Sequence, residues 1–287
     1  MARKRVWIVG TVSWDTVVYV DTFPKAGGFA QSNNRIERLG GSAANIAQGV
    51  ATAGVETGLI TFLGNDELGT RIATLLRESE IKHLEILNVE DNSSHALVVV
   101  DGPGDRTVIA LSNNYLSQLS LRSIDLQSQD IVVFPLWRPT FLENLNYARE
   151  IGCYTVVGLE AIADPRLPKA NLAIGSVSEL SDNSNVPEYL DRFDRIVVTS
   201  GAQGARLFCR SGVVDQPAIA TDVFDTTGAG DSFFAGFLAA LARGDSTGVP
   251  GMKAGALWSA AMVAQYRSIP PHASEVAGLM NVLDSFE

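Results

Sequence analysis

The sequence predicts an α/β fold with a mostly parallel central sheet, helices on both faces and a small accessory β-sheet. From about residue 130 onward, short apolar runs alternate regularly with helix-length segments, which is the pattern of βαβ units. Near the N-terminus, the apolar runs Val6–Gly10 and Leu59–Leu63 are almost continuous, as in strands buried on both faces. Two glycine-containing sequences also stand directly before predicted helices.

The first half of the chain carries two predicted helices after these strands. The alanine-rich segment Ser42–Ala53 is compatible with a helix, and Gly54 stands where a helix commonly ends. A second helix is expected over Gly69–Glu80, with Ile72, Leu75 and Leu76 turned inward.

The accessory sheet is predicted from two β-rich parts of the first half. In Thr16–Arg38, Val18 and Val20 alternate with polar residues, which favours a half-exposed β segment. The runs His95–Asp101 and Thr107–Leu111 flank a Gly-Pro-Gly-Asp sequence and therefore predict a hairpin. We expect these parts to pair with one another.

The second half is expected to supply most of the parallel sheet. Its predicted strands are Ile131–Pro135, Tyr154–Leu159, Leu172–Gly175 and Arg195–Thr199. Helices are expected over Asp231–Arg243, closed by Gly244, and over Leu257–Tyr266. In such a fold, ligands bind at the carboxyl ends of the strands.

Composition and charge exclude several classes of function. The chain has 287 residues, 46% of them hydrophobic and 19% charged, and its net charge of −10 disfavours a nucleic-acid-binding surface. Cys153 and Cys209 are the only cysteines, so neither a disulfide framework nor a structural zinc site is expected. We expect one domain over residues 1–287 and a cytoplasmic protein without membrane partners.

The strongest motif is Asp225-Thr-Thr-Gly-Ala-Gly-Asp231, which leads directly into a predicted helix. Gly228 and Gly230 allow backbone N–H groups to converge at the helix start, where the unpaired donors and the helix dipole favour an anion. Asp231 would lie beside this site and could accept a proton from an attacking hydroxyl. It could also simply cap the helix, but capping does not explain the two glycines or Asp225.

Two further glycine sequences are weaker signals. Gly40-Gly41-Ser-Ala-Ala-Asn45 also opens a predicted helix, so it fits either close approach of a ligand or a plain tight turn. Thr199-Ser-Gly201-Ala-Gln-Gly204 follows a predicted strand and, taken alone, is more often a hairpin turn. The P-loop and dinucleotide-binding fingerprints do not occur in the sequence.

Taken together, these motifs resemble those of the ribokinase-like, or pfkB-type, carbohydrate kinases. The resemblance extends over nearly the whole chain: Asp15 after the first strand, the Gly40–Ala47 sequence followed by Gly64–Gly69, and the Asp225–Asp231 sequence occur in the family's order. It implies an ATP-dependent phosphotransferase with the ribokinase-like fold, acting on a hydroxyl, expected to be a primary one, of a small sugar-like substrate.

The resemblance also implies roles for individual residues. Asp231 would be the catalytic base, with the N–H groups of Gly228, Ala229 and Gly230 stabilising charge on the phosphoryl group. The other implied roles are sugar binding by Asp15, Gly40, Gly41 and Asn45, and nucleotide binding by Thr199, Gly201, Gly204, Asp225 and Thr227. Segments of about 16–38 and 93–112 would form a β lid, through which some family members dimerise.

Two departures from the family pattern concern ions. Where the family has Asn-x-x-Glu near a magnesium–water cluster, this sequence has Ser176-Val-Ser-Glu179, so Glu179 would hold Mg²⁺ through water without the asparagine. The loop Gln265–Pro271 lacks the glycine that accompanies potassium binding in many members. Activation by a monovalent cation is therefore not expected from the sequence.

The acceptor stays open at this point. Ketoses, pentoses, nucleosides and sugar-amine adducts all fit, and Arg38, Arg106 or Arg138 could meet a charged group of the substrate or serve other purposes. A non-catalytic sugar or nucleotide sensor with the same fold is the alternative, although a sensor needs no base at position 231.

Overall fold

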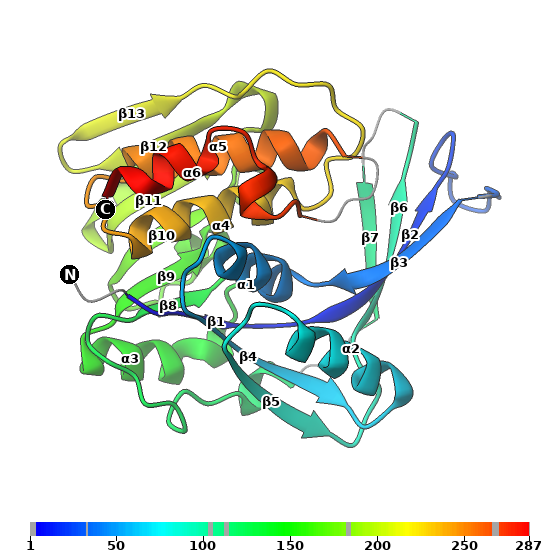
Figure 1. Cartoon of the computed structure of the whole chain (residues 1–287), viewed down its shortest axis with the longest axis horizontal. Helices are drawn as coiled ribbons and strands as arrows, with labels where there is room; N and C mark the ends of the chain where they lie inside the picture. Colours follow the sequence, from blue (N-terminus) through cyan, green and yellow to red (C-terminus); the bar gives the residue numbers. More distant parts are fainter. Residues whose placement is uncertain are drawn as a thin grey trace.

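A computed structural model describes residues 4–32, 34–102, 106–111, 115–181, 185–265 and 270–286. Its central element is a nine-stranded sheet with the strand order β13-β12-β11-β10-β9-β8-β1-β4-β5 (Figure 1). All pairs from β11 to β5 in this order are parallel, and β12 and β13 continue the sheet as an antiparallel hairpin. The strands are β1 (Val6–Val9), β4 (Thr57–Gly64), β5 (His83–Val89), β8 (Ile131–Phe134), β9 (Tyr154–Gly158), β10 (Ala170–Ser176), β11 (Phe193–Thr199), β12 (Ala205–Cys209) and β13 (Gly212–Gln216).

Helices cover both faces of this sheet, as predicted. In β1, Val6 and Ile8 pack into the hydrophobic core that includes α1, α2, α4, α5 and α6, whereas Trp7 and Val9 pack into the core that includes α3. Both faces of the strand are therefore buried, which accounts for its continuous apolar sequence. The helices are α1 (Ser42–Thr52), α2 (Glu67–Glu78), α3 (Leu142–Ile151), α4 (Ala229–Ala242), α5 (Val249–Val263) and α6 (Leu279–Leu283). In the part of the chain that the structure describes, no helix is long and apolar enough to cross a membrane.

A second, four-stranded sheet stands beside the central one (Figure 1). Its order is β3-β2-β6-β7, so the two β-rich parts of the sequence pair as expected; residues 33, 103–105 and 112 of the predicted segments lie outside the described residues. The strands of this small sheet are β2 (Ser13–Tyr19), β3 (Arg35–Gly40), β6 (His95–Val100) and β7 (Arg106–Leu111). In the strand register, Asp15 lies opposite Arg38 on one side and Ala96 on the other, so these side chains share one face.

Some sequence-based boundaries were wrong. Helix α5 begins at Val249, well before the predicted Leu257, because its glycines serve packing: a Cβ atom on Gly255 would lie 2.7 Å from the carbonyl oxygen of Phe233 in α4. The strands β5, β12 and β13 were not predicted. Among the described residues, β9 is followed by a 3₁₀ helix over Leu159–Ala163 rather than by an α-helix, so a helix-length connection did not mean an α-helix there.

Helices α1 and α4 cross at very close range. A Cβ atom on Gly49 of α1 would lie 2.7 Å from the Cβ of Ala235 in α4. Gly49 is the eighth residue of α1 and Ala235 is the seventh residue of α4, so each lies about two turns after the start of its helix. The contact therefore brings the two glycine-led helix N-termini toward each other.

Asp245 is expected to stabilise the start of α5 without affecting ligand binding. Its buried carboxylate accepts hydrogen bonds from the backbone N–H groups of Thr247, Gly248 and Gly251 at 2.8–2.9 Å and from the Thr247 hydroxyl at 3.0 Å. Asp245→Ala should lower the free energy of unfolding by about 2–4 kcal/mol, since several buried donors lose their acceptor. Denaturant melts measure this loss, and Asp245→Asn, which keeps one acceptor oxygen, should lose less. Equal losses in the two variants would contradict this account.

Candidate active site

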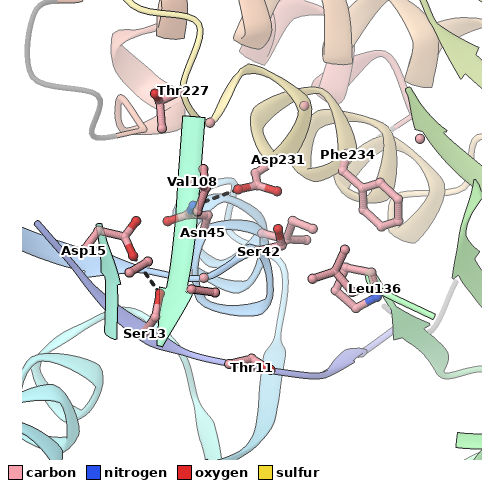
Figure 2. Close-up of a pocket in the computed structure, with 18 of the residues that line it drawn as sticks. Thr11, Ser13, Asp15, Ser42, Asn45, Val108, Leu136, Thr227, Asp231 and Phe234 are labelled. Carbon is pink, nitrogen blue, oxygen red and sulfur yellow. Dashed lines mark hydrogen bonds between the residues drawn. The ribbon is translucent and has the colours of Figure 1, made fainter. Parts of the chain in front are cut away.

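A cavity of about 610 Å³ lies between the small sheet and the first turns of α1 and α4. It also reaches the carboxyl ends of β8, β10 and β11, where the sequence predicted a ligand. Figure 2 shows side chains of β2, α1 and α4 directed toward a common space. The predicted site residues on its walls are Asp15, Gly41, Asn45, Glu179, Thr199, Thr227, Gly228, Gly230 and Asp231.

A hydrogen bond joins the two glycine-led helices at the centre of this cavity. The Asn45 side-chain amide of α1 donates to Oδ2 of Asp231 in α4 at 2.7 Å (Figure 2). Asn45 lies four residues before Gly49, and Asp231 lies four residues before Ala235, so the bond stands one turn from the close helix contact on both helices. The packing of the helices thus positions the carboxylate.

The surroundings of Asp231 suit a proton acceptor. Burial raises the pKa of its carboxyl group, and this effect is opposed by hydrogen bonds from Asn45 and Ser42 and by the charges of Arg106 and Arg38. A raised pKa makes a carboxylate a better base than an ordinary aspartate.

The loop before α4 is shaped by residues of the Asp225–Asp231 motif. Asp225 is buried, accepts a hydrogen bond from the Thr227 N–H at 2.8 Å, and receives the Tyr19 hydroxyl of the small sheet at 3.3 Å. Gly228 has a φ of 78°, a left-handed conformation that favours glycine. Helix α4 begins at Ala229, whose N–H donates to the Thr226 carbonyl at 3.3 Å. Gly230 and Asp231 of the first turn line the cavity, and N–H groups at such a position have no intrahelical acceptor and can bind an anion.

Asp15 reaches the cavity from the opposite side. Ser13 donates its hydroxyl to Oδ1 of Asp15 at 2.7 Å (Figure 2), and the carboxylate occupies the space that a Cβ atom on Gly40 would fill. Gly40 therefore makes room for Asp15 rather than lining the cavity. Gly41 has a φ of 88° and precedes α1, where a Cβ atom would lie 2.6 Å from the Thr11 carbonyl oxygen.

A second cavity, of about 580 Å³, adjoins the first at Thr199 and Gly230. The Gly201–Gly204 sequence forms the turn between β11 and β12, closed by a hydrogen bond from the Ser200 N–H to the Gly204 carbonyl at 2.7 Å. This turn forms one wall of the cavity. Much of the remaining lining consists of apolar side chains from the 218–223 segment and from α5. Those side chains are Ala218, Ile219, Ala220, Val223, Ala256, Ala260 and Val263. Such a slot fits a flat heterocycle next to phosphate-binding backbone.

Glu179 and Glu160 form a carboxyl pair at the ends of β9 and β10. Oε1 of Glu179 accepts the Ser176 N–H at 3.0 Å, so Ser176 and Glu179 form a capping box. Each carboxyl group fills space that a Cβ atom would need, at Gly158 for Glu160 and at Gly175 for Glu179. Burial and the neighbouring Glu179 carboxylate raise the pKa of Glu160 to about 7, and burial also raises the pKa of Glu179.

The sequence analysis did not identify Glu160 as a site residue, and it left the role of Arg38 undecided. Glu160 could have been suspected because it closely follows a glycine at a strand end: it lies two residues after Gly158, and Glu179 lies four residues after Gly175. The role of Arg38 depends on its cross-strand position opposite Asp15, which no local pattern reveals.

The Glu160–Glu179 pair should make stability depend on pH. A carboxyl group whose pKa is raised by folding binds more protons when folded, so its contribution to stability is lost as pH rises above the ordinary glutamate range. Glu160→Gln removes one titrating group, and we expect the variant to lose less stability than the parent between about pH 5 and pH 8. Melting temperatures across this range measure the difference. Parallel curves for the two proteins would contradict the raised pKa of Glu160.

Comparison with known proteins agrees with this geometry. Residues 3–269 match the pfkB family of carbohydrate kinases. The chain is 31% identical over 258 residues to an ATP-dependent ribose-1-phosphate kinase of Halopiger xanaduensis, covering 84% of this chain and 86% of that protein. It is 27% identical to the ribokinase of Bacillus subtilis, covering 84% and 87%, and 26% identical to a nucleoside kinase of Methanocaldococcus jannaschii, covering 84% of each.

Solved structures show the same fold. The ribokinase of Thermotoga maritima superposes with a TM-score of 0.73 at 19% identity, covering 98% of each chain. A Burkholderia thailandensis nucleoside kinase in complex with inosine gives 0.81 at 15% identity, again over 98% of each chain. At these identities the likeness concerns the fold, whereas the family rests on the sequence match. The chain belongs to the pfkB family of carbohydrate kinases and is a sugar or nucleoside kinase with the ribokinase-like fold.

Proposed function

We propose that this protein transfers the γ-phosphoryl group of ATP to a primary hydroxyl of a small sugar or sugar-like substrate. The observation that carries the proposal is the Asn45–Asp231 hydrogen bond, which holds a carboxylate of raised pKa at a helix N-terminus between two adjoining cavities. The relatives quoted above are named for ribose 1-phosphate, ribose and nucleosides, whose common part is a pentose.

The transfer is written as a direct displacement. Asp231 accepts the proton of the acceptor hydroxyl, whose oxygen forms a bond to the γ-phosphorus. The bond between that phosphorus and the β–γ bridging oxygen breaks, and ADP leaves with the electron pair. The N–H groups of Gly228, Ala229 and Gly230 stabilise the charge on the moving phosphoryl group.

Substrates bind on the two sides of this loop. Asp15 and Asn45 hold sugar hydroxyls, with Gly40 and Gly41 shaping that end of the larger cavity. Thr199, Gly201 and Gly204 line the phosphates of ATP, its base fills the apolar slot, and Asp225 and Thr227 keep the loop in shape for the nucleotide.

Kinases of this family use ATP with a divalent cation, here proposed to be Mg²⁺. Among the described residues, no group of three or more His, Cys, Asp or Glu side chains could hold a metal. Mg²⁺ commonly keeps several waters and binds one or two carboxylates together with nucleotide phosphates, so Glu179, through water, fits. When bound, the ion supplies charge neutralisation on the phosphates. The loop considered for potassium falls largely on residues 266–269, outside the described residues.

The small sheet is proposed to act as a lid and as the interface of a homodimer. Its face toward the cavity carries Val98 and Val108, while Ile109 and Leu111 on its opposite face are 47% and 61% exposed. Closure of the inner face would exclude water and limit hydrolysis of ATP.

Asp15 should decide sugar binding. Asp15→Ala is expected to weaken substrate binding by about 1–3 kcal/mol, because hydroxyls and Ser13 lose their buried acceptor, while ATP affinity changes little. Gly40→Ala should give a similar loss by displacing the same carboxylate. Calorimetric titration with sugar and with an ATP analogue separates the two affinities. Unchanged sugar affinity and turnover in Asp15→Ala would refute the assigned pocket.

Asp231 should decide turnover. Asp231→Asn keeps the size of the side chain but cannot take the proton, so kcat should fall by at least about 10²-fold with affinities within a few-fold of the parent. If Asp231 only capped α4, stability would fall by about 1 kcal/mol or less and kcat would barely change. Steady-state kinetics and the melting temperature of the variant distinguish the two. In the parent, kcat/KM should also decline on acidification at a pH above the ordinary aspartate range, since burial raises the pKa of Asp231.

A further inference from the structure

The larger cavity contains a buried cation without hydrogen bonds. Arg38 is 5% exposed, and its Nε, Nη1 and Nη2 atoms have no hydrogen-bond partner among the described residues. Its guanidinium forms an ion pair with Asp15, in which Nη2 lies 3.7 Å from Oδ2, beyond hydrogen-bond range. Burial lowers the pKa of this guanidinium, an effect that the carboxylates of Asp15, Asp225 and Asp231 oppose.

Neutralisation of Asp15 does not account for this arrangement by itself. Oδ1 of Asp15 already accepts the Ser13 hydroxyl, and a guanidinium that served only as its partner would gain from donating directly to Oδ2. Five N–H donors in a planar fork are instead left for a group that enters the cavity.

Other buried polar atoms on the cavity wall also lack a hydrogen-bond partner among the described residues. The hydroxyls of Ser94 and Thr227 are buried and have no hydrogen-bond partner among the described residues, and both residues line the cavity with Arg38. Ser94 directly precedes β6 and lies on the side of the small sheet that carries Asp15 and Arg38. The end of the cavity near Arg38 is therefore built to bind a strongly polar group.

Two more arginines indicate that the bound polar group is negatively charged. Arg106 of β7 and Arg138 after β8 line the same cavity, and each has donated one Nη1 hydrogen bond to a backbone carbonyl, of Thr226 and Trp137 respectively. Asp15, Glu179 and Asp231 also line the cavity, but each accepts a hydrogen bond within the protein, from Ser13, Ser176 and Asn45 respectively, whereas Arg38 makes none among the described residues. Arginine forks suit phosphate geometry, so the chemistry favours an anion over a neutral hydroxyl.

We propose that the acceptor is a sugar that already carries a phosphate monoester, bound by Arg38 and Ser94 while its free hydroxyl meets Asp231. This rests on the proposed function and names the substrate class of the same site. Arg38 is then a specificity-determining residue, and the transfer step at the hydroxyl is unchanged.

The test compares matched substrates. Release of ADP is measured with ribose, ribose 1-phosphate, ribose 5-phosphate, fructose and fructose 6-phosphate, with gluconate as a carboxylate-bearing probe. We expect kcat/KM for at least one sugar phosphate to exceed that of its parent sugar by about 10²-fold or more. Arg38→Met should abolish this preference, and Arg38→Lys, which keeps the charge without the fork, should retain part of it. Arg77→Met on the exposed face of α2 is the matched control and should behave as the parent.

The outcomes separate this proposal from the kinase proposal. Phosphorylation of parent sugars as efficiently as sugar phosphates, or an equal loss for both classes in Arg38→Met, would overturn the anionic acceptor and leave the kinase standing. Preference for gluconate over the phosphates would assign a carboxylate instead and overturn the phosphate. If neither class is turned over, the kinase proposal fails, and the melting temperature of the parent protein still decides: a rise with sugar phosphates but not with parent sugars supports the anion site, and no rise refutes it.

Discussion

The close crossing of α1 and α4 is the constraint on which the site depends. Gly49 lets α4 approach until Ala235 occupies the space of its missing side chain, and one turn away Asn45 and Asp231 come within 2.7 Å. A larger side chain at position 49 would push the helix axes apart and with them the hydrogen bond. The two signature sequences, far apart in the chain, thus become one catalytic unit through a packing contact that involves neither motif.

Missing side chains also position the carboxylates of the site. Asp15, Glu160 and Glu179 each occupy the space beside a glycine, at Gly40, Gly158 and Gly175. A carboxylate held against bare backbone has little freedom to turn away, so its direction is fixed before a ligand arrives. This preorganisation has an electrostatic consequence, since the same burial raises the pKa of the Glu160 and Glu179 carboxyl groups.

Much of the fold could be predicted because it follows from local patterns. Continuous apolar runs gave β1, β4 and the β8–β11 strands, and the glycine sequences marked the starts of α1 and α4. The start of α5 could not be predicted from the local sequence, because glycines such as Gly251 and Gly255 disfavour a helix. In the structure, their missing side chains leave room for Phe237 and Phe233 of α4 to pack against α5.

The site shows the same division between local and tertiary information. Asp231 and Asn45 stand in motifs whose chemistry can be argued from neighbouring residues. The role of Arg38 depends on its cross-strand neighbour Asp15, and that of Glu160 depends on Glu179 in the 3₁₀ helix after β10. The Gly201–Gly204 turn belongs to both kinds: it is the β11–β12 turn that its sequence favours, and it also lines the second cavity.

In the proposed function, catalysis and selectivity belong to different parts of the molecule. The proposed base and the proposed anion-binding N–H groups belong to helices anchored in the main core, whereas Asp15, Arg38 and Arg106 belong to one face of the small sheet. Residues on that sheet can change without disturbing the α1–α4 contact, which fits a fold shared by proteins named for ribose, ribose 1-phosphate and nucleosides. The negative net charge of the chain is no obstacle to an anionic acceptor, because the field in a cavity is set by the few charges on its walls.

Arg106 also joins the two parts, since its hydrogen bond to the Thr226 carbonyl ties β7 to the loop that precedes α4. If the small sheet closes on a substrate as proposed, this hydrogen bond would couple the closure to the loop that carries the proposed phosphoryl site.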